Sequence, residues 1–219
     1  MSSNKVKNEG RNSLISVMVI TSLICLLPIA FGVICYDKMP SKIGIHFNNA
    51  GEADNYINKA LAIFGLPIGL ALLNLYNQFR LETDPKAKNY SVVLKQIFRW
   101  LIPVISVVAM SYTIIVAMGA NLKAAYIGNM IAGLLLIIVG NYLPKCHSNY
   151  TMGIKLPWTL DDEDNWNRTH RMAGFLWVVG GIVCLLNIFV KLTYIVIGVI
   201  AALVIVPILY SYLLYRKNN

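Results

Sequence analysis

Six long segments without Asp, Glu, Lys or Arg constrain the fold of this chain more than any other feature of its sequence. Each segment has 19 to 24 residues, and a helix needs roughly 20 to cross the hydrocarbon core of a bilayer. Lipid cannot satisfy backbone hydrogen bonds, so segments of this kind are expected to be helical. The six segments are Leu14–Tyr36, Ala60–Phe79, Trp100–Asn121, Ala124–Leu143, Met172–Val190 and Leu192–Tyr215. The sequence therefore predicts an all-α fold, a polytopic membrane helical bundle with about six transmembrane helices and the lipid bilayer as its surroundings.

The composition excludes a soluble domain, because only 13% of the residues are charged, whereas soluble domains carry about 25%. The second segment is the weakest of the six, since it contains Gly65, Pro67, Asn74, Asn77 and Gln78. It is expected either to kink or to enter the membrane only partway, and the second outcome would change the helix count by one. The first segment follows basic residues, as a signal peptide would, but its apolar run is too long and no cleavage site follows closely. We interpret it as an uncleaved first helix.

The distribution of Lys and Arg predicts how the chain is oriented in the membrane. The N-terminal tail, the second loop, the fourth loop and the C-terminal tail hold 14 of these residues, and the opposite face holds 5. Cytoplasmic loops carry the excess of Lys and Arg, so both termini are predicted to be cytoplasmic (N-in, C-in). The net charge of +9 is then a topology signal. Its dispersal over short loops argues against nucleic-acid binding.

The expected helices and loops divide the chain into three regions. Residues 1–59 contain the first helix and an extracytoplasmic loop. Residues 60–123 contain the second and third helices, joined by a basic cytoplasmic linker, Arg80–Arg99. Residues 124–219 contain the last three helices and the cytoplasmic fourth loop.

The first loop has the pattern of an extended segment. Ile43, Ile45 and Phe47 alternate with other residues, and a period of two is typical of a strand. A turn signal, Asn48–Gly51, follows, and Tyr56 is expected at the membrane interface. His46 has two interpretations: a contact for an external ligand, or an interfacial ring beside Phe47.

The fourth loop contains "MGIKLPWTLDDEDNWNRTH", a polar stretch between two apolar segments. Thr159 and Asp162 fit the spacing of a capping box, and four consecutive acids, Asp161–Asp164, suit the first turn of a helix. The pattern predicts a helix that begins near Thr159 and continues into the fifth apolar segment. Trp158 and Trp166 are expected in the headgroup region, where aromatic rings anchor helices.

The polar residues of the fourth loop leave three classes of function open. A metal site or an enzyme is one class, because Cys146, His147 and His170 lie near the acids. Their spacing matches no familiar zinc pattern, and His170 is either a general base or a hydrogen-bonded structural residue. A transporter is the second class, although the apolar segments contain amides rather than ionisable residues, and amides more often tie helices together. A binding protein is the third. Neither a metal nor a cofactor is expected, and the four cysteines are interpreted as packing residues.

The two polar loops also share a loose echo, "GIHF…DNYINK" in the first and "GIKL…DNWNRTH" in the fourth. Each echo follows the first helix of a three-helix half of the chain. An inverted repeat is one interpretation of this arrangement, and chance is the other.

The stretch "GNYLPKCHSNYTMGIKLPWTLDDEDNWNRTHR" resembles the signature of the SdpI family, bacterial membrane proteins that include immunity proteins against a secreted toxic peptide. The P-W-T-L sequence followed by W-x-x-T-H carries the resemblance. The first loop is similar to a small domain, P-x(5)-H-F, often found at the start of these proteins. One departure is Lys155, where the family pattern has arginine. Lysine keeps the positive charge but cannot bind an anion through two parallel hydrogen bonds, as arginine can. The two regions and the six helices cover nearly the whole chain.

This resemblance implies that the protein protects its cell from a membrane-active peptide toxin and signals by recruiting a cytoplasmic repressor. It also implies candidate partner-binding residues on both faces of the membrane. In the cytoplasmic loop these are Asn141, Asn149, Lys155, Pro157, Trp158, Thr159, Trp166, Thr169, His170 and the adjacent Arg171. In the extracytoplasmic loop they are Pro40, His46, Phe47, Gly51, Asp54 and Lys59.

Overall fold

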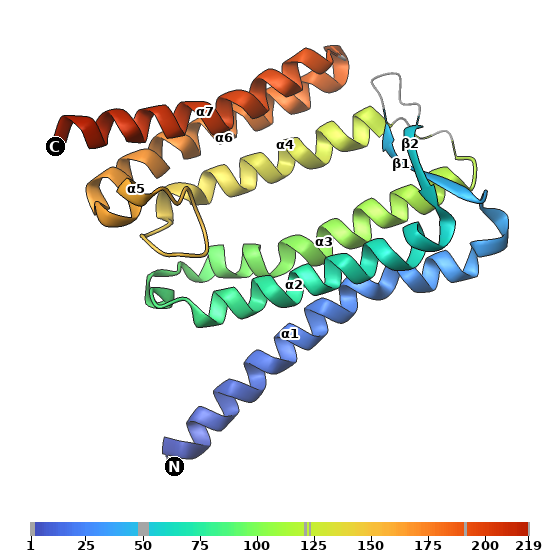
Figure 1. Ribbon diagram of the computed structural model, residues 1–219, viewed down its shortest axis with the longest axis horizontal. Helices are drawn as coiled ribbons and strands as arrows, with labels where there is room; N and C mark the ends of the chain where they lie inside the picture. Colours follow the sequence, from blue (N-terminus) through green and yellow to red (C-terminus); the bar gives the residue numbers. More distant parts are fainter. Residues whose placement is uncertain (1–2, 48–52, 121, 123, 191, 219) are drawn as a thin grey trace. The chain divides into compact units, whose positions relative to one another are not determined.

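A computed structural model describes residues 3–47, 53–120, 122, 124–190 and 192–218 (Figure 1). The long helices are α1 (Ser3–Ile34), α2 (Leu66–Thr83), α3 (Val92–Ala117), α4 (Ala124–Tyr142), α6 (Glu163–Val190) and α7 (Thr193–Asn218). The short elements are strands β1 (Lys42–Phe47) and β2 (Ala53–Asn58), helix α5 (Pro157–Asp161), and single turns η1 (Tyr36–Lys38), η2 (Leu61–Gly65), η3 (Ala87–Asn89) and η4 (Leu143–Lys145). The predicted all-α fold is confirmed, with one small two-stranded sheet added.

Six helices in the described parts of the chain are long and apolar enough to cross a membrane, as the sequence predicts. Between 17% and 33% of each apolar window is buried inside the protein, which leaves most of the apolar surface for lipid. The spans are Leu14–Ile34, Leu61–Thr83, Val92–Ala117, Ile127–Lys145, Glu163–Val190 and Tyr194–Lys217.

The second span is complete, so the helix count stays at six. It opens with a π-helical turn, η2, in which the Leu66 N–H bonds to the Leu61 carbonyl, five residues back. Pro67 follows directly, and a proline has no N–H to offer an ordinary helical ladder. The wider turn therefore lies where proline disturbs the ladder, and the helix continues to Thr83.

The basic linker between the second and third spans is shorter than predicted. Helix α2 continues to Thr83 and α3 already begins at Val92, because Arg, Leu, Glu, Lys and Gln favour helices even where they are too polar for lipid. An ion pair between Arg99 and Glu82 joins the two helix ends.

The internal contacts of the chain define two compact units. The first contains α1, the hairpin, α2, and α3 from Gln96 onward. Its hairpin packs through Ile43 against a cluster that includes Met39, Ile63 and Ile114. The extended segment that the sequence predicts is present as β1, but of the three alternating apolar residues only Ile43 is buried, whereas Ile45 is exposed and Phe47 is half-buried.

Amide side chains tie the helices of the first unit together. Asn74 Nδ2 on α2 donates hydrogen bonds of 3.0 Å to Thr21 Oγ1 and Ser22 Oγ on α1. Asn77 Nδ2 donates to the Phe98 carbonyl on α3. These contacts confirm the prediction that polar residues inside the spans serve helix–helix packing.

The second unit contains the loop Thr83–Lys95 and helices α4 to α7. Helices α4 and α6 run side by side in Figure 1, and glycines allow their close approach. A Cβ on Gly133 would lie 2.8 Å from the Gly181 carbonyl oxygen, and a Cβ on Gly140 would lie 2.9 Å from that of Gly174. The two contacts are seven residues apart on each helix, so both fall on one face. This packing holds the two ends of the fourth loop together.

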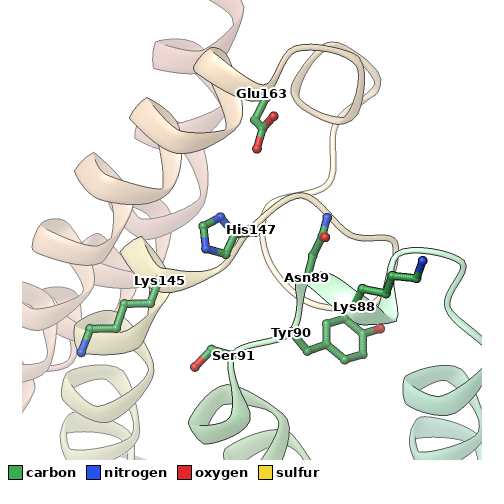
Figure 2. A pocket seen from close by; sticks show the side chains of 7 residues that line it. All are labelled: Lys88, Asn89, Tyr90, Ser91, Lys145, His147 and Glu163. Carbon is green, nitrogen blue, oxygen red and sulfur yellow. The ribbon is translucent and has the colours of Figure 1, made fainter.

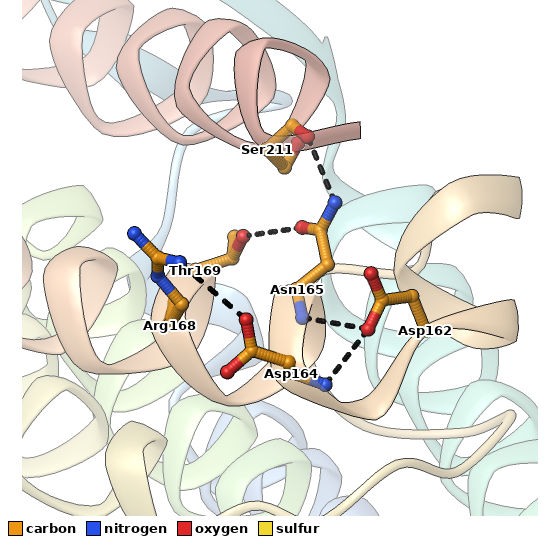
Figure 3. Close-up of polar contacts among 6 residues, drawn as sticks. All are labelled: Asp162, Asp164, Asn165, Arg168, Thr169 and Ser211. Carbon is orange, nitrogen blue, oxygen red and sulfur yellow. Dashed lines mark hydrogen bonds and ion pairs between the residues drawn. The ribbon is translucent and has the colours of Figure 1, made fainter. Parts of the chain in front are cut away.

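The fourth loop differs from the prediction at the start of its helix. Thr159 lies in the third position of a separate one-turn helix, α5, and α6 begins only at Glu163. Asp162 has extended backbone, and its Oδ1 accepts the N–H groups of Asp164 and Asn165 (Figure 3). The predicted cap at Thr159 is therefore wrong, and Asp162 fills that role because its carboxylate reaches the free amides of the first turn.

The two echoing segments of the sequence adopt different structures. "GIHF" lies in β1 and "DNYINK" largely in β2, whereas "GIKL" has no regular structure and "DNWNRTH" is helical. The likeness between the two loops is therefore confined to sequence.

Candidate functional site

The core of the fourth loop is a stacked pair of rings on α6. The rings of Trp166 and His170 are parallel to within 21°, with centroids 4.0 Å apart, and neither side chain is exposed. Trp166 Nε1 donates to the Cys146 carbonyl. The two residues share a helix face, as four-residue spacing requires. Trp166 is thus a core residue, and its predicted place among lipid headgroups is wrong, because the loop folds back over its ring.

Hydrogen bonds occupy both ring nitrogens of His170. Nδ1 lies 2.8 Å from the Trp166 carbonyl, which can only accept, so Nδ1 carries the proton. Nε2 accepts the N–H of Ile154 at 2.9 Å. The imidazole is therefore held neutral in one tautomer, with no free lone pair for a general base or a metal. The geometry favours the structural interpretation of His170.

Gly153 allows the loop to pass close to this ring. Its φ is +100°, and a Cβ there would lie 2.5 Å from His170 Nε2. Only glycine adopts such a conformation without strain. Position 153 therefore requires glycine, both for its backbone conformation and for its close contact with the His170 ring.

Asn149 organises the turn before Gly153. Its Oδ1 accepts the N–H groups of Thr151 and Met152, and its Nδ2 donates to the His147 carbonyl. Cys146 lies beside it, 3% exposed. Burial raises the pKa of the Cys146 thiol to about 11, although a hydrogen bond from Asn149 opposes the shift. The thiol is therefore protonated at neutral pH and poorly suited to nucleophilic or metal chemistry.

The end of the loop is tied to α7. Trp158 Nε1 donates to Ser211 Oγ, and its ring packs edge-on against Tyr212. Asn165 Nδ2 donates to the Ser211 carbonyl, and Asn165 Oδ1 accepts from Thr169 (Figure 3). The predicted residues Trp158 and Thr169 thus serve the attachment of the loop to the last helix.

The Thr159 side chain makes hydrogen bonds to the backbone at the start of the short helix α5. Its Oγ1 accepts the Leu156 N–H and donates to the Ile154 carbonyl, and the side chain is fully buried. Pro157 occupies the first position of α5, which needs no N–H donor.

A carboxylate that sequence reasoning missed joins the second loop to the fourth. Asp84 is 8% exposed, and its side chain accepts from Tyr90 Oη and the Lys86 N–H in its own loop. Across the gap it accepts from the Tyr150 N–H and Thr151 Oγ1. Lys86 and Asn89 add hydrogen bonds to Ser148. The two loops therefore form one surface.

This surface contains a pocket of about 520 Å³. Figure 2 shows the seven side chains that line it, three of them from the fourth loop and its neighbouring turns. They are Lys88, Asn89, Tyr90, Ser91, Lys145, His147 and Glu163. None of the ten predicted residues of the cytoplasmic loop lines the pocket, because most of them build the loop beneath it.

Four of those ten residues are exposed rather than built into the loop: Asn141, Lys155, Pro157 and Arg171. Lys155 Nζ donates to the carbonyls of Tyr150 and Thr151. The binding role of these four exposed residues stays a prediction.

The predicted residues of the first loop are spread over the hairpin. His46 Nδ1 pairs with Asp54 Oδ1 across the strands, with 69% and 44% of the two side chains exposed. Lys59 Nζ donates to the carbonyls of Tyr36, which begins turn η1, and Met39, which follows it. Pro40 is exposed and Phe47 is half-buried, whereas Gly51 lies outside the described residues.

Metal chemistry finds little support in the described parts of the chain. No group of three or more His, Cys, Asp and Glu side chains there is placed to hold a metal ion. The zinc alternative drew on Cys146, His147, His170 and the acids Asp161–Asp164. Of these, Cys146 and His170 are buried, and His147 is exposed.

The chain matches two family models. Residues 145–211 match the SdpI/YfhL protein family, and residues 23–71 match a domain of unknown function, DUF1648. The chain is also similar to the "Immunity protein SdpI" of Bacillus subtilis (strain 168). The two are 27% identical over 204 residues, which is 92% of this chain and 97% of that protein. No solved structure matches the chain significantly. Together with the six spans, these matches show a multi-pass membrane protein that is similar to the SdpI/YfhL family over residues 145–211.

Proposed function

We propose that this protein is an integral-membrane immunity protein that protects its cell from a secreted, membrane-active peptide. The similarity to a protein named for immunity carries the proposal, since it extends over 92% of this chain and 97% of that protein. A shared motif alone would leave the rest of the chain unmatched.

The geometry of the fourth loop supports a binding role over catalysis. The groups with the most useful chemistry, the His170 imidazole and the Cys146 thiol, are buried and hydrogen-bonded within the loop. A catalytic base needs a lone pair within reach of substrate. The His170 imidazole and the Cys146 thiol therefore do not support the enzyme alternative.

The hairpin is the proposed contact for the external peptide. The charge distribution predicts that it lies outside the cell, and it presents the His46–Asp54 pair beside the exposed ring of Tyr56. Aromatic and charged side chains of this kind are frequent in protein–peptide interfaces.

The joined surface of the second and fourth loops is the proposed site for a cytoplasmic repressor. It is held together by Asp84 and displays the exposed side chains of Lys155 and Arg171. Arg171 is exposed, whereas Lys155 also donates hydrogen bonds to the Tyr150 and Thr151 carbonyls, so partner binding by variants of these residues is compared at matched membrane levels.

Survival of a toxin-sensitive strain tests the proposal. Cells that express the protein are expected to survive a membrane-active peptide that kills the parent strain. Substituting His46 and Tyr56 with alanine is expected to abolish protection at unchanged membrane levels. The matched control, Lys42→Ala in the same hairpin, is expected to protect normally. If Lys155→Ala with Arg171→Ala loses protection as well as repressor recruitment, the division of labour between the two faces is wrong.

A further inference from the structure

The pocket between the second and fourth loops has the composition of a ligand site. All seven of its lining residues are polar or carry a polar group. Asn89 and Tyr90 are fixed by hydrogen bonds to Ser148 and Asp84. These two residues therefore form a fixed wall of the pocket.

Four other lining side chains have no partner within the described residues: Lys88, Ser91, His147 and Glu163. In Figure 2, Glu163 and Asn89 point toward the space beside the His147 ring. The Lys145 ammonium lies 4.7 Å from the Tyr142 ring. Figure 2 shows the Lys145 and Lys88 ammonium groups at opposite sides of the pocket, both pointing away from the His147 ring. A group of hydrogen-bonding side chains that the protein itself leaves unused is free to bind a ligand.

The sign of the charges identifies the class of ligand. Lys88 and Lys145 bring two ammonium groups, and Ser91 adds a hydroxyl. Helix α3 begins directly after Ser91, at Val92, and the N-terminal end of a helix is positive. Phosphate is the common anion that several separate donors and a helix N-terminus bind together. Glu163 is the single acid in the pocket, and it would repel a bare anion but attract an ammonium group.

We propose that this pocket binds a phosphate group that carries a neighbouring ammonium group, as phosphoethanolamine does. On binding, the flexible Lys88 and Lys145 side chains turn inward and hold the phosphate together with Ser91, and Glu163 holds the ammonium. The pocket lies where α3 begins, α4 ends and α6 begins, at one end of three membrane spans. A phospholipid headgroup and a free phosphoethanolamine compound share this chemistry.

Thermal unfolding of the purified full chain in detergent tests the site, because a ligand that binds the folded state raises its Tm. The probes are dioctanoyl-phosphatidylethanolamine, dioctanoyl-phosphatidylglycerol, soluble phosphoethanolamine, and dioctanoylglycerol, which has no phosphate. Each variant is compared with its own ligand-free Tm, so a change in stability does not hide the result. The ethanolamine lipid is expected to raise Tm at lower concentration than the glycerol lipid, and dioctanoylglycerol is expected to have no effect.

Two variants and a control assign the effect to the pocket. Lys88→Ala with Lys145→Ala is expected to weaken binding by about tenfold or more, since it removes two charge-assisted contacts. The control, Lys38→Ala with Lys42→Ala, removes the same charge elsewhere and is expected to bind normally. Glu163→Gln is expected to erase the preference for ethanolamine over glycerol.

Each result decides a part of the proposal. The site would be overturned if dioctanoylglycerol raised Tm as much as the ethanolamine lipid does. Normal binding by the Lys88→Ala, Lys145→Ala variant would also overturn it. A preference that survives Glu163→Gln would overturn the role of Glu163. Soluble phosphoethanolamine that binds as tightly as the lipid would assign the site to a free compound; binding of the lipid alone would assign it to the bilayer. The outcome is independent of immunity, which is measured in cells.

Discussion

Thr151 Oγ1 donates a 2.7 Å hydrogen bond to Asp84 Oδ2. The two residues are 67 positions apart in the chain, and their contact joins the second loop to the fourth. Tyr150 adds its backbone N–H to the same carboxylate oxygen. Two spans separate the loops, so both emerge on one side of the membrane. The contact makes them a single structural module.

Replacing Asp84 with alanine is expected to separate the two loops. The change leaves four donors without their acceptor. Each hydrogen bond to a charged group contributes about 1.5–3 kcal/mol to the free energy of unfolding. We expect a lower Tm and faster proteolysis between residues 84 and 91. The exposed Asp161 provides the control, and Asp161→Asn is expected to behave as wild type. Equal proteolysis of Asp84→Ala and wild type would contradict the role of Asp84.

The same carboxylate predicts an acid limit to stability. Burial alone would raise the pKa of Asp84, but hydrogen bonds from Tyr90, Thr151, Lys86 and Tyr150 together lower it below its ordinary 3.8. Its stabilising contribution is therefore complete above the ordinary value and is lost as pH falls through the lower, folded-state value. The Tm difference between wild type and Asp84→Asn is expected to be constant from pH 7 to about 5 and to shrink near pH 3. A difference that grows in acid would show that the shift has the opposite sign.

Gly153→Ala is expected to disturb the His170 ring as well as strain the backbone. Gly153 and Gly119 both have positive φ, at +100° and +95°. A Cβ at Gly119 meets nothing within 4 Å, whereas at Gly153 it meets His170 Nε2. Each change costs about 1–3 kcal/mol of backbone strain, and only Gly153→Ala also breaks the contact with the ring. Chemical denaturation of the two variants compares them directly; equal losses would mean that the ring moves aside freely.

The two histidines of the fourth loop are expected to respond differently to substitution. His170→Ala removes a buried ring and leaves the Ile154 N–H without its acceptor, which costs about 2–4 kcal/mol. Membrane levels of this variant should fall. His147 is exposed and has no such contact, so His147→Ala should accumulate normally. His170→Ala at full level with function lost would instead favour a direct chemical role.

Cys146 is expected to resist thiol reagents in the folded protein. It is 3% exposed, and burial raises its pKa to about 11, so little thiolate forms at pH 7.5. Placing a cysteine at the exposed neighbour, His147→Cys, should add one rapidly labelled thiol, measured by mass spectrometry. Fast labelling of Cys146 itself in the native wild type would mean that the loop opens readily.

The sequence predicts the spans and the extended segment that forms β1, because both depend on local patterns, but it does not predict strand β2. Charge-free runs mark the six helices, and alternation at Ile43, Ile45 and Phe47 marks β1. The start of α6 was misplaced because Thr159 and Asp162 both carry capping side chains. Residue types alone do not decide between them.

Long-range contacts explain what the sequence does not predict. Trp166 has the amphipathic ring of an interfacial residue, and only the chain that folds over it makes it a core residue. Asp84 sits in a plain charged linker, and nothing near it in the sequence points to Thr151. The glycines Gly133 and Gly140 offered a usable signal, since small residues seven apart in a span favour close helix packing.

Protection of living cells tests the central claim most directly. A strain sensitive to secreted membrane-active peptides is transformed with the wild-type gene or with the His46→Ala, Tyr56→Ala variant, and survival is counted at matched membrane levels. The account predicts that wild type raises survival against at least one such peptide and that the variant does not. Wild-type cells that die as readily as the parent strain, across a panel of these peptides, would contradict it.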